Sequence, residues 1–306
     1  MHGSRSKLEG LRDGLVGYVQ GPSHRTRRHS ETVQFARLFS DLQIEKWWYS
    51  VDEIHTERKL GDGSNWFRPR PPTLDDAVLT ANDRAAVLFD FGGTLDADGL
   101  PWKERMSRLF REEGAHVPRD RFDPAFYTAD DALVGTLPAT TSFQATVERL
   151  AAGVAQALQL SDPDIAARVA RRFLGDSLRV LDENMPLLRG LGRRYRLGIV
   201  SNFYGNLAQV CDDAGIRSLF GVLVDSAEVG CTKPAPRIFQ LALGALGVSA
   251  AKATFVGDSL PRDMAGARGV GMPHIWLVGA QALAAMPCCP DDRQIRSLRE
   301  LEAILL

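Results

Sequence analysis

The segment VLFDFGGTLD, residues 87–96, predicts the first strand of the fold and the turn that follows it. Its apolar start is typical of a buried strand. This run delivers one carboxylate, Asp90, before the chain reaches Gly92 and Gly93, where the backbone can turn tightly. A nucleophile placed at the end of a strand has this pattern. A buried strand whose aspartate caps the next turn has it too, so the downstream sequence has to separate the two interpretations.

Four further apolar runs with the composition of strands follow, and helical segments separate them. The runs are residues 196–200, 220–224, 253–256 and 274–278. Strands that alternate with helices predict an α/β fold with a doubly wound parallel sheet. In such a sheet, ligands bind outside the carboxyl ends of the strands.

The region between the first two strands has helical periodicity. Thr141–Leu158 is expected to form a helix with an apolar face, and Thr141 and Gln144 are placed for a capping box. A second helix is expected to start at residues 161–163. We interpret the region as an inserted helical bundle whose apolar stripes serve packing.

Residues 1–83 form an N-terminal extension to which we assign no role. A helix is predicted over Ser30–Gln43, and aromatic patches occur at residues 46–49 and 65–67. Exposed tryptophans are unfavourable, so these patches are expected to pack on something. They either cover the main domain or form the surface for a protein partner or a homodimer.

The overall composition excludes several classes of function. The formal charge of −1 comes from 37 basic and 38 acidic side chains, so no overall field favours nucleic acid or an anionic membrane. The four cysteines form no CxxC metal motif and no evident disulfide framework, and the N-terminus lacks an apolar signal-peptide core. We therefore expect reduced thiols, a cytoplasmic location, and neither nucleic acid nor a membrane as partner.

Four polar side chains follow the predicted strands, at their carboxyl ends or in the next loop: Asp90, Ser201, Lys233 and Asp258. The two carboxylates can hold a hard cation such as Mg²⁺, which keeps several waters and binds substrate phosphate. Ser201 can donate a hydrogen bond to a phosphoryl oxygen, and Lys233 adds positive charge beside developing negative charge. Each residue alone has a structural explanation, but together they predict a functional site.

The chain resembles the haloacid dehalogenase superfamily of hydrolases in four short motifs that occur in the family's order. They are Asp90–Thr94, Ser201–Asn202, Lys233 within residues 231–239, and Gly257–Ser259 followed by Asp263. The resemblance covers about residues 85–280, and it includes helices where the family places a C1-type cap. It implies a Rossmann-like core formed by residues 84–98 and 186–306, with the helical cap at residues 99–185.

The resemblance also implies how the core would work. Asp90 would be the nucleophile that forms an aspartyl-phosphate, which water then hydrolyses. Mg²⁺ would be held by Asp90, Asp258 and the main-chain carbonyl of Gly92, and Asp263 would support the metal or the lysine from close by.

The remaining motif residues would act on the phosphoryl group. Ser201 would bind the phosphoryl oxygens, with Asn202 beside it, and Lys233 would neutralise charge on the nucleophile and the phosphoryl group. The cap would close over the site, exclude water and select the leaving group.

Gly92 departs from the pattern of the family's phosphatases. They usually carry a second aspartate at this position as general acid and base, and a glycine cannot protonate a leaving alkoxide. Loss of such a group lowers the rate by roughly 10²- to 10⁴-fold. We hypothesise that Asp96, or else Asp98 or a metal-bound water, takes this role, or that the substrate has a good leaving group.

Two functions of different class follow. The first is a Mg²⁺-dependent phosphatase of a small phosphorylated metabolite. The alternative is a non-catalytic or regulatory protein that binds metal, phosphate or a protein partner. Dehalogenase activity is disfavoured, because haloacid-specific members carry an aromatic residue at the position of Gly92 and need no metal. Trp102, Lys103 and Arg105 could reach an anionic substrate, or could be solvated charges of the cap.

Overall fold

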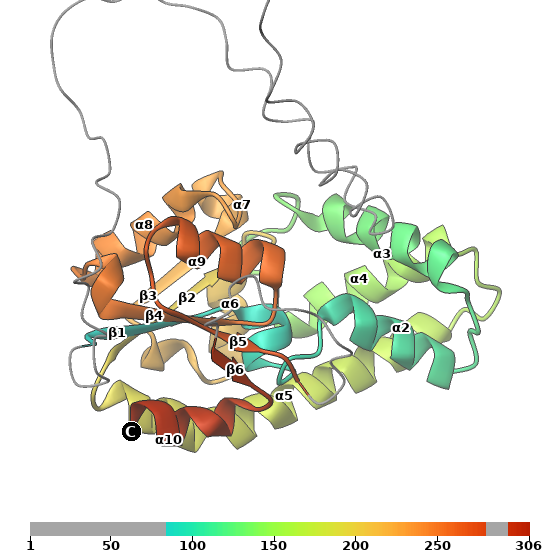
Figure 1. Ribbon diagram of the computed structural model, residues 1–306. Coiled ribbons are helices and arrows are strands. Elements are labelled where there is room, and N and C mark those ends of the chain that lie inside the picture. Colours follow the sequence, from blue (N-terminus) through green and yellow to red (C-terminus); the bar gives the residue numbers. More distant parts are fainter. Residues whose placement is uncertain (1–83, 280–292) are drawn as a thin grey trace, which may run out of the picture. The chain divides into compact units, whose positions relative to one another are not determined.

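The computed structural model describes residues 84–279 and 293–306, which fold around one parallel β-sheet (Figure 1). Within these ranges the sheet has six strands in the order β3-β2-β1-β4-β5-β6, and all neighbours are parallel. The strands are β1 (Ala86–Phe89), β2 (Arg196–Ser201), β3 (Val222–Asp225), β4 (Ala253–Gly257), β5 (His274–Leu277) and β6 (Arg293–Ile295). The predicted doubly wound α/β fold is confirmed. The short strand β6 was not predicted, because three residues give no readable periodicity.

The central position of β1 follows from its composition. All four of its residues are fully buried. Ala86 and Leu88 join the apolar core on one face of the sheet, and Val87 and Phe89 join the core on the other. The strand order reverses between β1 and β4, and this switch point is where doubly wound sheets bind ligands.

Helices cover both faces of the sheet. Figure 1 shows α8 and α9 on one face and α5 with α10 on the other. The helices are α2 (Trp102–Glu112), α3 (Arg119–Leu133), α4 (Phe143–Ala157), α5 (Ile165–Gly192), α6 (Leu207–Asp213), α7 (Ser226–Val229), α8 (Pro236–Leu246), α9 (Ala265–Gly269) and α10 (Leu301–Leu305). Short π-helical turns, η2 (Phe91–Leu95) and η5 (Leu260–Met264), follow β1 and β4 closely.

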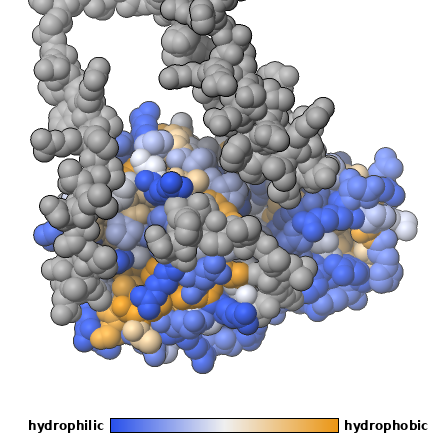
Figure 2. All heavy atoms as spheres, in the orientation of Figure 1, coloured by the Kyte–Doolittle hydropathy of each residue, from blue (hydrophilic) through white to orange (hydrophobic). Residues whose placement is uncertain are grey.

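The region between β1 and β2 is helical, as predicted, and consists mainly of α2 to α5. In Figure 1 the helices α2 to α4 lie beside the sheet, and α5 runs from this group along the sheet. On the face shown in Figure 2, hydrophilic residues predominate over α2 and α3. The predicted boundary between cap and core, at residues 185 and 186, falls inside the 28-residue helix α5.

The start of α4 corrects one prediction. The helix begins at Phe143, and its N-cap is Ser142, whose Oγ accepts a hydrogen bond from the main-chain N–H of Ala145 at 3.1 Å. Thr141, the predicted capping residue for a box with Gln144, lies one position too early. Adjacent hydroxyl residues are both good caps by type, so only the geometry of the chain's entry distinguishes them.

Several sequence predictions lie outside the described residues. These are the N-terminal extension with its helix at Ser30–Gln43, its aromatic patches, and Cys288 and Cys289. In the described part of the chain, Cys211 and Cys231 are free thiols. No helix there is both long enough and apolar enough to cross a membrane.

Candidate active site

Asp90 lies directly after β1, at the carboxyl edge of the sheet. The residue is 7% exposed, and its Oδ1 accepts hydrogen bonds from Ser201 Oγ and from Lys233 Nζ, each at 2.7 Å. The parallel register of β1 with β2 places the ends of these strands side by side, which brings Ser201 to Asp90. Because both bonds use Oδ1, the other carboxylate oxygen, Oδ2, is left for a different partner.

Lys233 is buried between two carboxylates. Its Nζ lies 2.7 Å from Asp90 Oδ1 and 2.7 Å from Asp263 Oδ1. Burial alone would lower the pKa of Lys233, but the charges of Asp263 and Asp90 outweigh burial and raise this pKa. Lys233 therefore keeps its positive charge beside the candidate nucleophile.

The side chain of Asn202 holds the backbone of Lys233. Its Oδ1 accepts from the Lys233 N–H at 2.7 Å, and its Nδ2 donates to the Lys233 carbonyl at 3.2 Å. These paired bonds join the end of β2 to the loop that carries the lysine. Asn202 also lines the pocket above Asp90, so it borders the site in addition to fixing the lysine loop.

Asp90 also belongs to a cluster of three carboxylates with Asp258 and Asp263. Oxygens of Asp90, Asp258 and Asp263 all lie within 4.8 Å of one another. Asp258 follows β4, and its Oδ1 accepts a hydrogen bond from Thr94 Oγ1 at 3.0 Å. Burial, together with the charges of Asp90 and Asp263, raises the pKa of Asp258 to about 8. This concentration of negative charge suits a divalent cation with oxygen ligands.

The two glycines after Asp90 differ in how strongly the structure restricts them. Gly93 has a φ of 92°, and a Cβ at this position would lie 2.6 Å from Asp258 Oδ2. At Gly92 a Cβ would lie 3.2 Å from Nε1 of Trp102, whose indole ring packs against the glycine. A side chain at position 92 would therefore need Trp102 to shift by a few tenths of an ångström.

Asp96 is fully buried in a polar network and does not line the pocket above Asp90. Its Oδ2 accepts hydrogen bonds from Trp102 Nε1 at 2.8 Å, Ser177 Oγ at 2.9 Å and Arg105 Nη2 at 3.0 Å. Its Oδ1 accepts from the Gly93 N–H at 2.8 Å. These contacts favour a structural role and argue against the acid/base role hypothesised for Asp96.

Arg105 also differs from expectation. It was expected either to reach an anionic substrate or to be solvated, but its side chain is 2% exposed and pairs with Asp96. Its guanidinium also stacks over the ring of Phe173, 3.4 Å from the centroid. Arg105 is a buried residue of α2, and sequence reasoning did not reveal that the buried carboxylate of Asp96 neutralises it.

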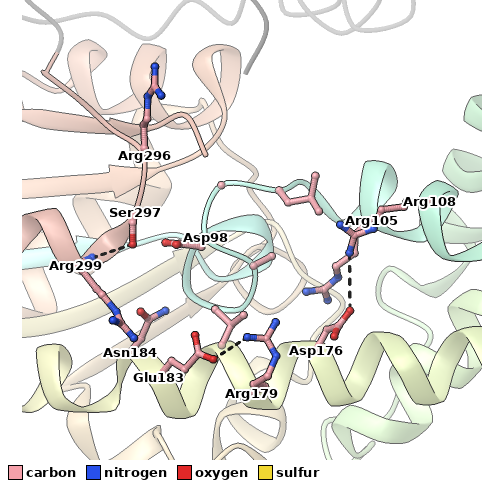
Figure 3. Close-up of a pocket in the computed structure, with 14 residues that line it drawn as sticks. Asp98, Arg105, Arg108, Asp176, Arg179, Glu183, Asn184, Arg296, Ser297 and Arg299 are labelled. Carbon is pink, nitrogen blue, oxygen red and sulfur yellow. Dashed lines mark hydrogen bonds and ion pairs between the residues drawn. The ribbon is translucent and has the colours of Figure 1, made fainter. Parts of the chain in front are cut away.

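Asp98, the second hypothesised acid/base residue, faces another cavity. Its Oδ1 accepts a hydrogen bond from the Leu298 N–H at 2.8 Å, which ties the C-terminal segment to the loop after η2. Figure 3 shows Asp98 beside Ser297 in this cavity of about 320 Å³, which is lined mainly by the loop after η2, α5 and the C-terminal segment. The contacts of Asp98 therefore favour a structural role as well.

A pocket of about 250 Å³ opens above Asp90. Its floor comes from the strand ends and the lysine loop: Asp90, Gly92, Ser201, Asn202 and Lys233. Its walls come from α2, α3, the loop after β2 and η5: Pro101, Trp102, Lys103, Glu104, Phe126, Tyr127, Asp130, Phe203, Tyr204 and Arg262. The pocket is thus polar and charged at its floor and rich in aromatic side chains along its walls.

Sequence reasoning missed most of the wall. Asp130 and Tyr204 form a hydrogen bond of 2.5 Å from the tyrosine hydroxyl to Asp130 Oδ1, which joins α3 to the loop after β2. Nothing in the sequence marks Asp130, because it sits in an amphipathic helix next to another aspartate. Arg262 could have been predicted as a site residue, since it directly precedes Asp263 in the motif that starts at Gly257.

The parallel sheet and the Asp-Ser-Lys-Asp cluster at its switch point define a Rossmann-like α/β protein with a candidate active site at the carboxyl ends of its strands. The sequence profile of the haloacid dehalogenase-like hydrolases matches residues 85–271, and the chain belongs to this family.

Relatives of known sequence agree with this assignment. The chain is 35% identical over 141 residues to haloacid dehalogenase-like hydrolase domain-containing protein 3 of Bos taurus, a match that covers 45% of this chain and 56% of the relative. It is 38% identical over 88 residues to the phosphoserine phosphatase of Thermus thermophilus, covering 29% of this chain and 35% of that protein. The chain thus spans about half the length of the curated relatives that it matches first.

The fold also matches solved structures. A structure titled as a dehalogenase with intermediate complex aligns with a TM-score of 0.53 at 19% identity, covering 74% of this chain and 99% of the other. At this identity the likeness concerns the fold alone.

Proposed function

We propose that the protein is a Mg²⁺-dependent phosphatase that hydrolyses a small phosphorylated metabolite through an aspartyl-phosphate on Asp90. The observation that carries the proposal is the pair of 2.7 Å contacts that fix Asp90 Oδ1 to Ser201 and Lys233 at the floor of a pocket. They orient one carboxylate oxygen and leave the other to attack. This arrangement is suited to nucleophilic catalysis by a carboxylate.

The residues around Asp90 fit a magnesium ion. Asp90 and Asp258 would hold it, with the main-chain carbonyl of Gly92 as a third ligand. The like charges of the clustered carboxylates are unfavourable at this spacing unless a cation or protons neutralise them. When bound, the ion would offset negative charge on the phosphoryl oxygens.

The side chains of the floor would divide the remaining work. Asp90 Oδ2 would attack phosphorus, and the bond from phosphorus to the leaving-group oxygen would break. When substrate binds, the Ser201 hydroxyl would turn from Asp90 Oδ1 and donate to a phosphoryl oxygen, while Lys233 would stay on Asp90 Oδ1 and offset the charge on Asp90 and the phosphoryl group. A water molecule would then attack phosphorus, release inorganic phosphate and restore the Asp90 carboxylate. Asp263 and Asn202 would keep Lys233 in place.

The size of the pocket supports a small substrate. A volume of about 250 Å³ lies just below the usual range for ligand sites, and the helices α2 and α3 would act as the cap that selects the leaving group. Two relatives are named for small phosphomonoesters, the phosphoserine phosphatase above and the glyceraldehyde 3-phosphate phosphatase of Pyrococcus abyssi, which is 40% identical over 92 residues. A cytoplasmic location is part of the proposal and fits the free thiols of Cys211 and Cys231 in the described part of the chain.

A phosphate-release panel tests the proposal. The wild-type protein is expected to hydrolyse an aryl phosphate and at least one small phosphometabolite with Mg²⁺ and not with a chelator. The isosteric change Asp90→Asn should abolish turnover, while Asp212→Asn, on the exposed side of α6, should leave it unchanged. Turnover that survives Asp90→Asn would contradict the proposal.

The alternative is a non-catalytic or regulatory protein that binds metal, phosphate or a protein partner. Gly92 favours it, because Trp102 fills the space beside this glycine and neither Asp96 nor Asp98 lines the pocket. In that case the aromatic patches of residues 1–83 would serve a protein partner or a homodimer. Measurable Mg²⁺ binding without turnover of any substrate in the panel would support this alternative.

A further inference from the structure

The side chain that exchanges a proton with the leaving group can be sought among the residues that line the pocket. Position 92 carries no side chain. Lys233 is engaged by two carboxylates, and arginine does not release its proton in proteins. On the wall, Lys103 donates to Asp123 at 2.5 Å, and Glu104 pairs with Arg119 at 2.7 Å.

The groups that remain are two tyrosines and one aspartate. Tyr127 is 49% exposed. The hydroxyl of Tyr204 is already committed as a donor to Asp130 Oδ1 at 2.5 Å. That bond fixes one oxygen of Asp130 and leaves Oδ2 available, on a side chain that lines the same pocket as Asp90.

We propose that Asp130, oriented by Tyr204, is the general acid and base that Gly92 does not supply. This inference rests on the proposed phosphatase function. Asp130 lies on α3 and Asp90 follows β1, so the two carboxyl groups enter the pocket from its wall and from its floor. A phosphoryl group attached to the floor would have its leaving group directed away from Asp90, because attack and departure are in line.

The surroundings of Asp130 suit a group that both gives and takes a proton. Burial raises its pKa above the ordinary value for an aspartate, and the neighbouring charge of Asp131 acts in the same direction. The hydrogen bond from Tyr204 and the charge of Arg262 oppose the shift, and the net pKa is raised. A raised pKa moves a carboxyl group toward the range in which general acids work at neutral pH.

Asp130 would give its proton in the first chemical step and regain one in the second. As Asp90 bonds to phosphorus, the electron pair of the breaking P–O bond stays on the leaving oxygen, which takes the proton from Asp130. The resulting Asp130 carboxylate then accepts a proton from the attacking water. The water oxygen bonds to phosphorus, and the bond between Asp90 and phosphorus breaks. Inorganic phosphate leaves, and Asp130 is again protonated.

Leaving-group dependence tests the inference on the whole 306-residue chain. Asp130→Asn keeps the acceptor for Tyr204 but carries no transferable proton. Its kcat/KM for an alkyl phosphate, a poor leaving group, should fall by about 10²- to 10⁴-fold. For p-nitrophenyl phosphate, whose leaving group needs no proton, kcat/KM should fall by less than about tenfold, with a burst of nitrophenolate as hydrolysis of the intermediate slows.

Two further variants separate a catalytic from a structural role. Asp120→Asn makes the same change at an exposed residue in the first turn of α3 and should keep wild-type kinetics. Tyr204→Phe removes the donor that lowers the pKa of Asp130, so the alkaline limb of kcat/KM for the alkyl phosphate should move to higher pH.

Equal losses for alkyl and aryl phosphates in Asp130→Asn, or wild-type turnover of the alkyl phosphate by this variant, would overturn the inference while leaving the proposed function intact. A wild-type protein that hydrolyses neither substrate would overturn both.

Discussion

The buried ion pair between Asp96 and Arg105 gives the sharpest prediction. Asp96→Asn keeps the shape of the side chain but removes its charge. The Arg105 guanidinium, 2% exposed, is then left inside the protein without a counter-charge. Breaking a buried pair by removing one partner destabilises a protein by about 3–5 kcal/mol. For a domain of this size, each kcal/mol lowers the melting temperature by about 2–4 °C, so a fall of about 6–20 °C is expected.

Thermal unfolding followed by circular dichroism measures this change, with turnover measured below the transition. Arg105→Met alone should be destabilising for the same reason, since it leaves Asp96 buried and unpaired. The double variant Asp96→Asn/Arg105→Met should recover part of the loss, because neither unpaired charge remains. Folded Asp96→Asn should keep turnover within about tenfold of wild type, since Asp96 is not assigned proton transfer.

The opposite pattern would refute this reasoning. If Asp96→Asn unfolds at the wild-type temperature but loses turnover by about 10²-fold or more, then Asp96 is the acid/base residue. Its four hydrogen-bond donors would in that case orient a catalytic carboxylate.

Three further predictions concern the carboxylate cluster and its lysine. Without metal, the free energy of unfolding should fall as pH rises toward about 8. Burial and nearby carboxylates raise the pKa of Asp258 to about 8, so in this pH range the folded state still holds a proton that the unfolded state has released. Mg²⁺ should reduce this fall in the free energy of unfolding, which urea unfolding at about pH 6 and about pH 8 measures. Equal free energies of unfolding at both pH values without metal would contradict the prediction. Gly93→Ala should abolish Mg²⁺ binding in calorimetry, since its Cβ would lie 2.6 Å from Asp258 Oδ2, and unchanged affinity would count against the assigned ligand. Lys233→Met leaves Asp90 and Asp263 without their shared cation and should lower kcat/KM by at least about 10²-fold; near-normal turnover would show that the lysine is dispensable.

The fold could be predicted from the sequence because its signals are local. Val87 to Phe89 are apolar without a break, as a strand covered on both faces must be, and the later runs repeat this pattern with helices between them. Parallel strands align their carboxyl ends, so the residues that follow them had to approach one another. Asp90 and Ser201 do so through strand register alone.

The parts that escaped prediction depend on contacts between distant segments. Asp96 looked available because its partners, Arg105 on α2 and Ser177 on α5, are fixed only when those helices pack against the nucleophile loop. Asp130 could not be predicted as a pocket residue, because its position depends on how α3 packs against the loop that carries Tyr204. Helical periodicity predicts the apolar face of α3, but it does not predict which pocket a polar residue beside that face lines.

Trp102 explains the departure at Gly92 in a way that sequence reasoning could not. The indole ring lies against the glycine and donates to Asp96, so one side chain fills the space beside position 92 and also closes the buried network. The absence of an aspartate at position 92 is therefore coupled to the packing of α2.

The most direct test of the central claim is to trap the phosphoryl group on Asp90. The wild-type protein is mixed with p-nitrophenyl phosphate and Mg²⁺, quenched in acid within the first turnover, and analysed by peptide mass spectrometry. We predict one added phosphoryl group on the peptide that contains Asp90, and none in Asp90→Asn. Hydrolysis of the substrate by the wild-type protein with the phosphoryl group on another residue, or with the same adduct in Asp90→Asn, would contradict the account.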